Sequence, residues 1–444
     1  MPSVSIQSRT KRTCDVLALA ITAFLLVLLA IRVPVGFALT IAGATGLYLL
    51  GGLPMVLGIM ETEPLSAASS YEIITIPMFL LMAEFVIISG VADDLFKAGS
   101  IWVGRVPGGL AISTALAGAG FGAVAGSSTA SAATLSSTSL PAMLRHGYEP
   151  KLACGVVAIS GTLAMLIPPS IALVLYGIIA DVNIGQLLIG GVVPGLVVTA
   201  AIALTVLFLV WLNPSHAPAG QAYTWGEKIR SLSNVWPMLL LFAAVTGVIY
   251  LGIATPTEAA AIGALGAYVV VLFKGKGGLK NTLHALTRAT ETTCMIIMII
   301  LGAHFFGYFL TITQTTQQIV ATIGALPVDR WVIMGIIILI YLVLGCFLDQ
   351  IAILILTIPV VLPIVTALGF DPVWFGVLVI VVGEVGMVTP PVGLNAFVVA
   401  RYAERPLNEV FIGVAPHVAA HLIVIALFCL FPQLILWLPS MMAR

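Results

Sequence analysis

The chain alternates long apolar stretches with short polar connections. A membrane-crossing helix needs ~20 apolar residues, so 444 residues allow about a dozen membrane segments, some of them re-entrant. The pattern therefore predicts an all-α polytopic membrane protein. Apolar segments are expected at about 16–31, 36–52, 73–90, 109–140, 152–180, 186–212, 235–252, 257–273, 291–312, 331–346, 350–369, 373–400 and 411–438.

The most hydrophilic connection, 213–234, divides the chain into two membrane halves of similar length, 1–212 and 235–444. In the first half we expect a hairpin near 109–140 and a broken segment at 152–180. In the second half the corresponding predictions are a hairpin near 331–369 and a broken segment at 373–400.

The two halves carry the same helix-breaking residues in the same register. Each landmark of the first half recurs 222 positions later: Ser127 and Asp349, Pro141 and Pro363, Gly161 and Gly383, Pro168 and Pro390. Repeats with interrupted membrane segments are typical of secondary transporters, which bind substrate and coupling ions near the bilayer midplane. The repeat therefore favours a transporter.

Composition and charge argue against a soluble protein and against a nucleic-acid-binding protein. Hydrophobic residues make up 60% and charged residues 8% of the chain, against roughly 25% charged residues in a soluble domain, and mean hydropathy is +1.17. The formal net charge is zero, so nothing indicates a nucleic-acid or polybasic lipid-binding face. The sequence lacks the GxxxxGK[ST] phosphate loop, so we expect no nucleotide cofactor and no enzymatic activity.

Small residues fill the segment 113–139, with Gly126, Ser127, Ser128 and Thr129 at its centre. Taken alone, such a stretch also fits a tightly packed helix interface. Polar, flexible residues can instead end one half-helix and begin another, which exposes backbone groups that are tolerated at membrane depth only beside a cavity or a bound ion. Hydroxyl and carbonyl oxygens suit Na⁺.

Paired prolines interrupt the two later segments. A proline inside a helix removes one hydrogen bond and clashes with the carbonyl four residues back, so Pro168 and Pro169 free acceptors in a segment without charges. The simpler interpretation is a kink, which is less convincing for a duplicated feature. In the second half, Thr389 to Gly393 combines a hydroxyl, two missing donors and a flexible glycine, followed by Asn395.

Two acidic residues stand in apolar surroundings in the second half. Asp349 follows the apolar run 331–348, and Glu384 is the only charged residue between 372 and 400. An intramembrane carboxylate is a functional candidate by default. The structural alternatives are that Asp349 lies at a helix end and that Glu384 pairs with another donor.

Several motifs, in order, resemble the large membrane subunit of tripartite ATP-independent periplasmic (TRAP) transporters. They are GSSTASAATL and GTLAMLIPPSIALVLYG within 126–177, TPTEAAAIGALGA at 255–267, and GEVGMVTPPVGLNAFV at 383–398. The resemblance implies an inverted-repeat, elevator-type fold with two re-entrant hairpins. It also implies Na⁺ as coupling ion, a small membrane (Q) subunit, a soluble periplasmic substrate-binding (P) subunit, and a place in the bacterial inner membrane.

The resemblance also implies site residues. One Na⁺ site would use Ser127, Ser128 and Thr129 with backbone near Gly161, Ile167 and Pro169. The other would use Gly345, Gly386, Thr389 and Val392. Candidate substrate or coupling residues are Gly126, Ser170, Asp349, Glu384, Pro390, Gly393 and Asn395.

The sequence therefore predicts the permease subunit of a Na⁺-coupled, binding-protein-dependent uptake system for a small carboxylate. A stand-alone dicarboxylate carrier or ion antiporter of related architecture is one alternative. A non-transporting membrane scaffold or channel subunit, in which the small residues serve packing alone, is another. A requirement for both Na⁺ and a soluble binding protein would separate the three.

Overall fold

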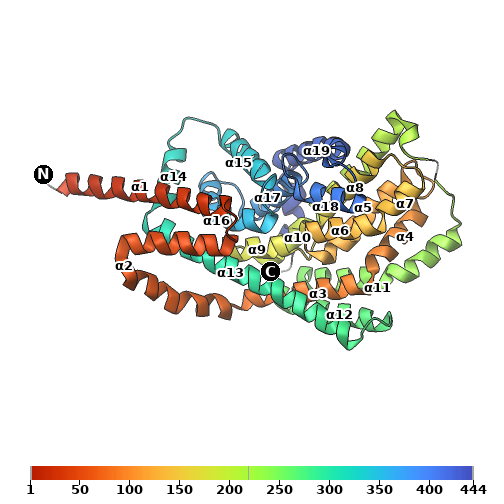
Figure 1. Ribbon diagram of the computed structural model, residues 1–444, viewed down its shortest axis with the longest axis horizontal. Coiled ribbons are helices and arrows are strands. Elements are labelled where there is room, and N and C mark those ends of the chain that lie inside the picture. The colour runs from red at the N-terminus through yellow and green to blue at the C-terminus, as the bar shows by residue number, and fades with distance from the viewer. Residues whose placement is uncertain (1–2, 219, 443–444) are drawn as a thin grey trace.

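The computed structural model describes residues 3–218 and 220–442, and all the secondary-structure elements of that range are helices (Figure 1). The all-α prediction is therefore confirmed. The first half contains α1 (Ser3–Ala30), α2 (Val35–Ser69), η1 (Tyr71–Ile74), α3 (Thr75–Ser89), α4 (Val91–Val103), α5 (Gly109–Ala125), α6 (Ser128–Thr138), α7 (Leu140–Arg145), α8 (Pro150–Gly161), η2 (Thr162–Met165), α9 (Ile171–Ala180), α10 (Ile184–Leu212) and η3 (Pro214–His216).

The second half contains α11 (Trp225–Tyr250), α12 (Pro256–Phe273), α13 (Leu279–Ile312), α14 (Thr315–Gly324), α15 (Arg330–Gly345), α16 (Gln350–Ala367), α17 (Pro372–Gly386), α18 (Leu394–Ala403), α19 (Leu407–Leu430) and α20 (Gln433–Ser440). Eight helical segments of the described chain are long and apolar enough to cross a membrane, and six further apolar helices are shorter. The protein is a multi-pass membrane protein.

Matching helices begin at nearly constant spacing in the two halves. The first residues of α1, α6 and α8 each lie 222 positions before those of α11, α16 and α17. Beyond the double prolines the spacing is 223, since α9 and α10 begin at Ile171 and Ile184 while α18 and α19 begin at Leu394 and Leu407. The second half therefore holds one additional residue between its double proline and the next helix, and the repeat noted at four landmarks extends over most of each half.

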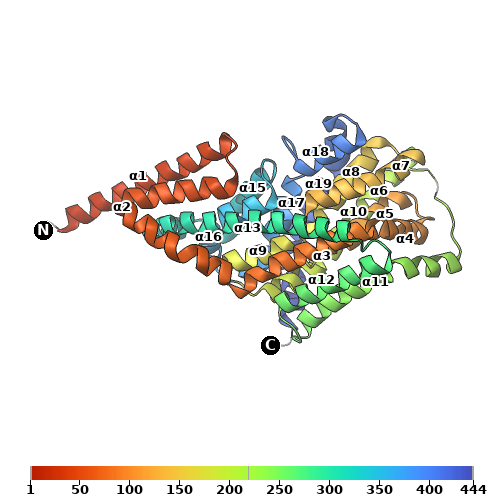
Figure 2. The same ribbon diagram turned by 60° about the horizontal axis from the view of Figure 1, so that its bottom comes forward.

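Two groups of helices pack side by side. The frame helices, α1–α3 and α11–α13, pack mainly through the pairs α2 with α13 and α3 with α12. The hairpin helices, α5–α10 and α15–α20, form the other group, with α8 on α19 and α15 on α17. In Figure 1 the frame helices α2, α13 and α12 run along the lower side, and Figure 2 shows α18, α19 and α8 above α3, α12 and α11. The helices α4 and α14 join the two groups along the chain.

The two halves interdigitate within the hairpin helices. A Cβ atom on Gly155 of α8 would lie 2.3 Å from the backbone of Gly413 in α19, so these helices touch through their backbones. Tyr176 of α9 donates a hydrogen bond of 2.7 Å to the carbonyl of Pro372. Such contacts hold the broken segment of the second half against the broken segment of the first half.

Candidate functional site

The first hairpin turns at the predicted break. Helix α5 ends at Ala125, and Gly126 adopts φ +59°, a left-handed conformation that suits glycine. Ser127 then caps α6, and its Oγ accepts a hydrogen bond from the backbone N–H of Ala130 at 3.4 Å. A Cβ atom on Gly126 would also lie 2.6 Å from the Ile171 side chain. The tip therefore packs directly against the start of α9.

The second hairpin turns in the same way with a different cap. Asp349 precedes α16, and its Oδ2 accepts hydrogen bonds from the N–H groups of Ile351 and Ala352 at 3.2 and 3.4 Å. Such caps satisfy N–H groups that have no partner within the helix. Asp349 therefore lies at a helix end, as the structural alternative for this residue proposed. A role in coupling stays a prediction.

Both broken segments contain the interruption that the prolines predict. After α8 the chain passes through η2 and the cis Pro168–Pro169 bond before α9, which is capped by Ser170. After α17 it passes through the cis Pro390–Pro391 bond before α18. The Ser170 hydroxyl donates to the Met165 carbonyl, and the N–H of Gly393 donates to the Cys346 carbonyl at 3.3 Å. Each interruption is therefore held by polar contacts.

Backbone contact between glycines forms the second predicted Na⁺ region. A Cβ atom on Gly345 would lie 2.5 Å from the carbonyl oxygen of Gly383, and one on Gly386 would lie 2.6 Å from the Cα of Gly345. Thr389 donates its hydroxyl to the Val385 carbonyl in the same region. The structure thus brings Gly345 and Gly386 together and places Thr389 one turn beyond.

The first predicted Na⁺ region is assembled less completely. A Cβ atom on Gly161 would lie 2.9 Å from the Ala132 side chain, so the end of α8 lies against α6. The Ile167 side chain instead packs against Gly195 of α10, at 2.4 Å from the position of a Cβ there. Only the backbone of Ile167 could therefore contribute to an ion site. The contacts of the described residues do not include one between Pro169 and the hairpin tip.

A cavity of about 710 Å³ joins the two hairpin tips. It runs between the tips and the frame helices α2 and α13. Both tips therefore face one space. Its lining includes Gly126, Ser127, Ser128, Thr129, Met165, Ile171, Asp349, Gln350 and Met387.

A buried polar cluster lies behind this cavity. The hydroxyl of Ser128 donates to Glu384 Oε2 at 2.6 Å, joining the first hairpin to α17 across 256 residues. Glu384 Oε1 and both amide atoms of Gln350 have no hydrogen-bond partner among the described residues. A Cβ on Gly383 would lie 2.2 Å from Gln350 Oε1, so Gln350 reaches the backbone beside Glu384. Glu384 thus pairs with a hydrogen-bond donor, as the structural alternative for this residue proposed. Its second carboxyl oxygen has no partner among the described residues.

Further buried polar side chains have no hydrogen-bond partner among the described residues. They include Asn395 at the start of α18, through both its amide oxygen and its amide nitrogen, and the hydroxyls of Ser131 and Ser160. Buried polar groups without partners are uncommon in native proteins and call for an explanation such as a bound ion. Hydroxyl, amide, carboxyl and carbonyl oxygens are chemically suited to Na⁺. The donor set therefore fits the ion that the sequence predicts.

Gln350 was not among the site residues predicted from the sequence, although the repeat pairs it with Ser128. It lies 222 positions after Ser128, and each is the first residue of its half-helix. The sequence also gave no sign that Arg288 and Arg401 line one cavity, because they lie on helices far apart in the chain.

Two hairpins, two broken helices and a cavity shared by both hairpin tips, within a bundle of membrane helices, define a polytopic membrane transporter. The family model of the DctM component of tripartite ATP-independent periplasmic transporters matches residues 22–434. The chain belongs to this family and is a TRAP transporter large permease subunit, a transporter rather than an enzyme.

Relatives that are named for different transported compounds have similar sequences. The C4-dicarboxylate TRAP transporter large permease protein of Pseudomonas aeruginosa is 34% identical over 371 residues, 83% of this chain and 86% of that protein. The isethionate TRAP transporter permease protein DctMQ of Oleidesulfovibrio alaskensis is 30% identical, over 91% of this chain and 64% of that protein. The crystal structure of the Alcanivorax borkumensis YdaH transporter aligns with a TM-score of 0.67 at 14% identity, covering 94% of this chain and 99% of that one. This last likeness concerns the fold alone.

Proposed function

We propose that this subunit imports a small organic acid on an inward Na⁺ gradient, together with a soluble binding protein. The observation that carries the proposal is the pair of repeat-related hairpin tips facing one cavity, supported by buried oxygens that have no partner in the part of the chain that the structure describes. Interrupted helices from two repeats form the substrate and ion sites of many secondary transporters. Family membership supports a small Q subunit and a periplasmic P subunit as partners, and the bacterial inner membrane as location.

An anionic substrate group is supported by a second cavity. It has a volume of about 980 Å³ and lies between the frame and hairpin helices, next to Ser127 and Thr129. Arg288 of the frame helix α13 and Arg401 of the hairpin helix α18 both line it, together with Glu84 and Glu404. Guanidinium groups recognise carboxylates and related anions. The names of the relatives include both a dicarboxylate and isethionate, which is consistent with an acid as substrate.

The elevator mechanism is supported by a third cavity, of about 510 Å³, which is the repeat counterpart of the second. Ser66 and Ser70 there lie 222 positions before Arg288 and Thr292, and Ile178 lies 223 positions before Arg401. The larger cavity reaches the first hairpin, whereas the lining of the smaller one contains no residue of the second hairpin. We propose that the larger cavity closes and the smaller one opens when the hairpin helices slide along the frame helices.

Na⁺ dependence tests the function directly. The subunit is reconstituted into liposomes with its Q subunit, and its P subunit is added outside with candidate acids. We expect import to follow an inward Na⁺ gradient and to vanish when the gradient is collapsed. Import energised by ATP without a Na⁺ gradient would refute the proposal. Import by this polypeptide alone would favour the stand-alone carrier, and the absence of any import under every condition would favour the scaffold.

Cysteine labelling tests the inverted repeat and the sliding motion. Thr292→Cys reports on the larger cavity and Ser70→Cys, its counterpart 222 positions earlier, on the smaller one. We expect a membrane-impermeant maleimide to label the two from opposite sides. Conditions that lower labelling of one should raise labelling of the other. Labelling of both positions from the same side would contradict the inverted arrangement.

A further inference from the structure

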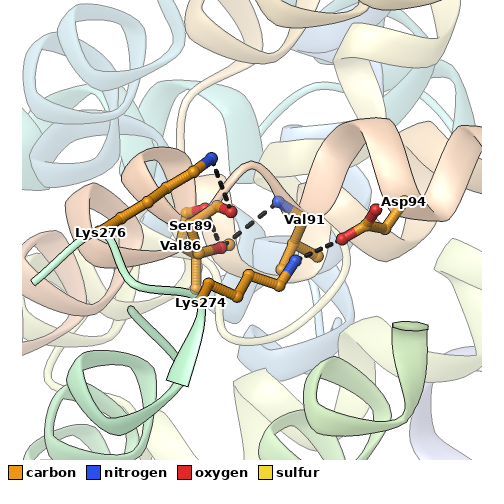
Figure 3. Close-up of polar contacts among 6 residues, drawn as sticks. All are labelled: Val86, Ser89, Val91, Asp94, Lys274 and Lys276. Carbon is orange, nitrogen blue, oxygen red and sulfur yellow. Dashed lines mark hydrogen bonds and ion pairs between the residues drawn. The ribbon is translucent and has the colours of Figure 1, made fainter. Parts of the chain in front are cut away.

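The loop between α12 and α13 fastens the corner between α3 and α4 (Figure 3). Lys274 forms a partly buried ion pair with Asp94 in the first turn of α4. Lys276 donates from Nζ to the backbone carbonyl of Ser89, the last residue of α3, at 3.1 Å. A cation at the C-terminal end of a helix also interacts favourably with the helix dipole. Two lysines of the second half thus hold a corner of the first half.

The corner itself is closely fitted. The Ser89 hydroxyl donates to the Val86 carbonyl at 2.7 Å and accepts from the N–H of Val91 at 3.3 Å. Gly90 has φ +75°, and a Cβ atom there would lie 2.7 Å from Nζ of Lys276. A side chain at this position would therefore both strain the backbone and displace the lysine.

The far end of α4 is fastened to α11. Trp102 lies edge-on to Trp225, with ring centroids 6.5 Å apart. The Lys228 ammonium lies 5.1 Å from the Trp225 ring and 5.9 Å from the Trp102 ring, within the range of cation–π attraction. Helix α4 also buries Val91 and Phe96 among other residues. Both ends of α4 are thus attached to helices or loops of the frame, while its body packs against the hairpin helix α5 as well as against α11.

The counterpart of α4 in the second half has no such attachments. The positions 222 residues from Lys274, Lys276 and Asp94 are Gly52, Pro54 and Thr316, and the position matching Trp102 is Gly324. None of these can form the ion pair or the aromatic contact. Helix α14 packs against α13 and α16, and none of its residues is buried. The two connecting helices are therefore held unequally.

We propose that α4 is a fixed part of the frame, and that the sliding of the first-half hairpin helices begins after it, in residues 104–108. Helix α14 instead follows the second hairpin, against which it packs through α16. This inference rests on the proposed sliding motion, and it assigns Asp94 and Lys274 the role of positioning residues. Gly104 and Gly108, the latter with φ +75°, supply the backbone freedom for a hinge at 104–108, and Pro107 between them has no N–H with which to continue a helix.

Cross-linking separates a fixed α4 from a moving one. In a background without the five native cysteines, Asp94→Cys with Lys274→Cys is joined by a short bifunctional thiol reagent. The matched pair joins α4 to the neighbouring hairpin helix α5: Gly99→Cys with Ser113→Cys. A Cβ on Gly99 would lie 3.4 Å from that of Ser113, close to the spacing of a disulfide. Na⁺-driven import is measured with the Q and P subunits present, before and after each link forms and after it is reversed.

We expect the first link to leave the import rate within twofold of the unlinked protein and the second to abolish import reversibly. Loss of import with the first link would overturn the proposal. The rate of link formation gives a readout that does not need import. For the first pair, the rate of link formation should be the same with and without Na⁺ and substrate. For the second pair, Na⁺ and substrate should change this rate. A rate that depends on Na⁺ or substrate in the first pair would also overturn the proposal. Absence of Na⁺-driven import in the cysteine-free parent, which keeps Asp94 and Lys274, would count against the proposed function instead.

A charge exchange adds a test of the residues themselves. Lys274→Asp alone should lower the import rate, because it sets two carboxylates side by side. Lys274→Asp combined with Asp94→Lys should restore the rate. A double variant no better than the single one would show that the pair does not position α4.

Discussion

Replacing Ser128 by alanine is expected to abolish transport and to destabilise the protein by about 3 kcal/mol. The hydroxyl of Ser128 is the hydrogen-bond donor to the buried carboxyl group of Glu384, at 2.6 Å. Removing one partner of a buried polar pair leaves the other unsatisfied, which costs about 1–3 kcal/mol for a neutral group and more for a charged one. Thermal unfolding in detergent and Na⁺-driven import would measure the two effects.

The neighbouring serine supplies the control. Ser127 caps α6 through a 3.4 Å hydrogen bond and does not contact Glu384 in the described contacts. Ser127→Ala should cost about 1 kcal/mol, as for other lost caps. The double variant Ser128→Ala with Glu384→Leu completes a thermodynamic cycle, and its stability should exceed that of Ser128→Ala alone. Simple additivity of the two substitutions would show that the pair contributes no interaction energy.

Replacing Gly345 by alanine is expected to destabilise the protein by about 1–3 kcal/mol, the usual range for an overpacked core. A Cβ at this position would lie 2.5 Å from the carbonyl oxygen of Gly383 and 2.8 Å from the Cα of Gly386. Both obstacles are backbone atoms, so α15 and α17 must separate to admit it. Since the second predicted Na⁺ region lies at this contact, import should also require a higher Na⁺ concentration.

The same helix offers a matched substitution with the opposite expectation. Gly335 also lies in α15, and nothing lies within 4 Å of a Cβ placed there. Gly335→Ala should leave import unchanged and stabilise the helix by up to about 1 kcal/mol, the difference in helix propensity. Equal effects of the two substitutions on stability and on Na⁺ dependence would argue against a special role for the contact of Gly345 with α17.

Features that depend on local interactions along the chain could be predicted from the sequence more fully than contacts between distant segments. Helix breaks were predictable at Gly126 and at both double prolines, because glycine and proline act on the backbone locally. The 222-residue register was visible for the same reason, whereas the shift to 223 was not, because a single added residue leaves no mark on composition. Asp349 proved to be a helix cap, which the sequence offered only as an alternative.

Contacts between distant segments were beyond the sequence. The bond of Ser128 to Glu384 and the shared cavity of Arg288 and Arg401 depend on how helices of the two halves pack. Both halves pack through apolar side chains and close glycine contacts, which accept many arrangements and specify no partner. The attachment of α4 by Lys274 and Lys276 escaped notice because the loop carrying them lies about 180 residues from its contacts.

The bond between Ser128 and Glu384 also has a consequence for biosynthesis. At about 5–20 residues per second, the ribosome needs roughly 10–50 s to make the 256 residues that separate the two partners. During that time the first hairpin is present in the membrane without α17, and the Ser128 hydroxyl has no final partner. The nascent first half must therefore be shielded from lipid by the insertion machinery or by another subunit until the second half emerges.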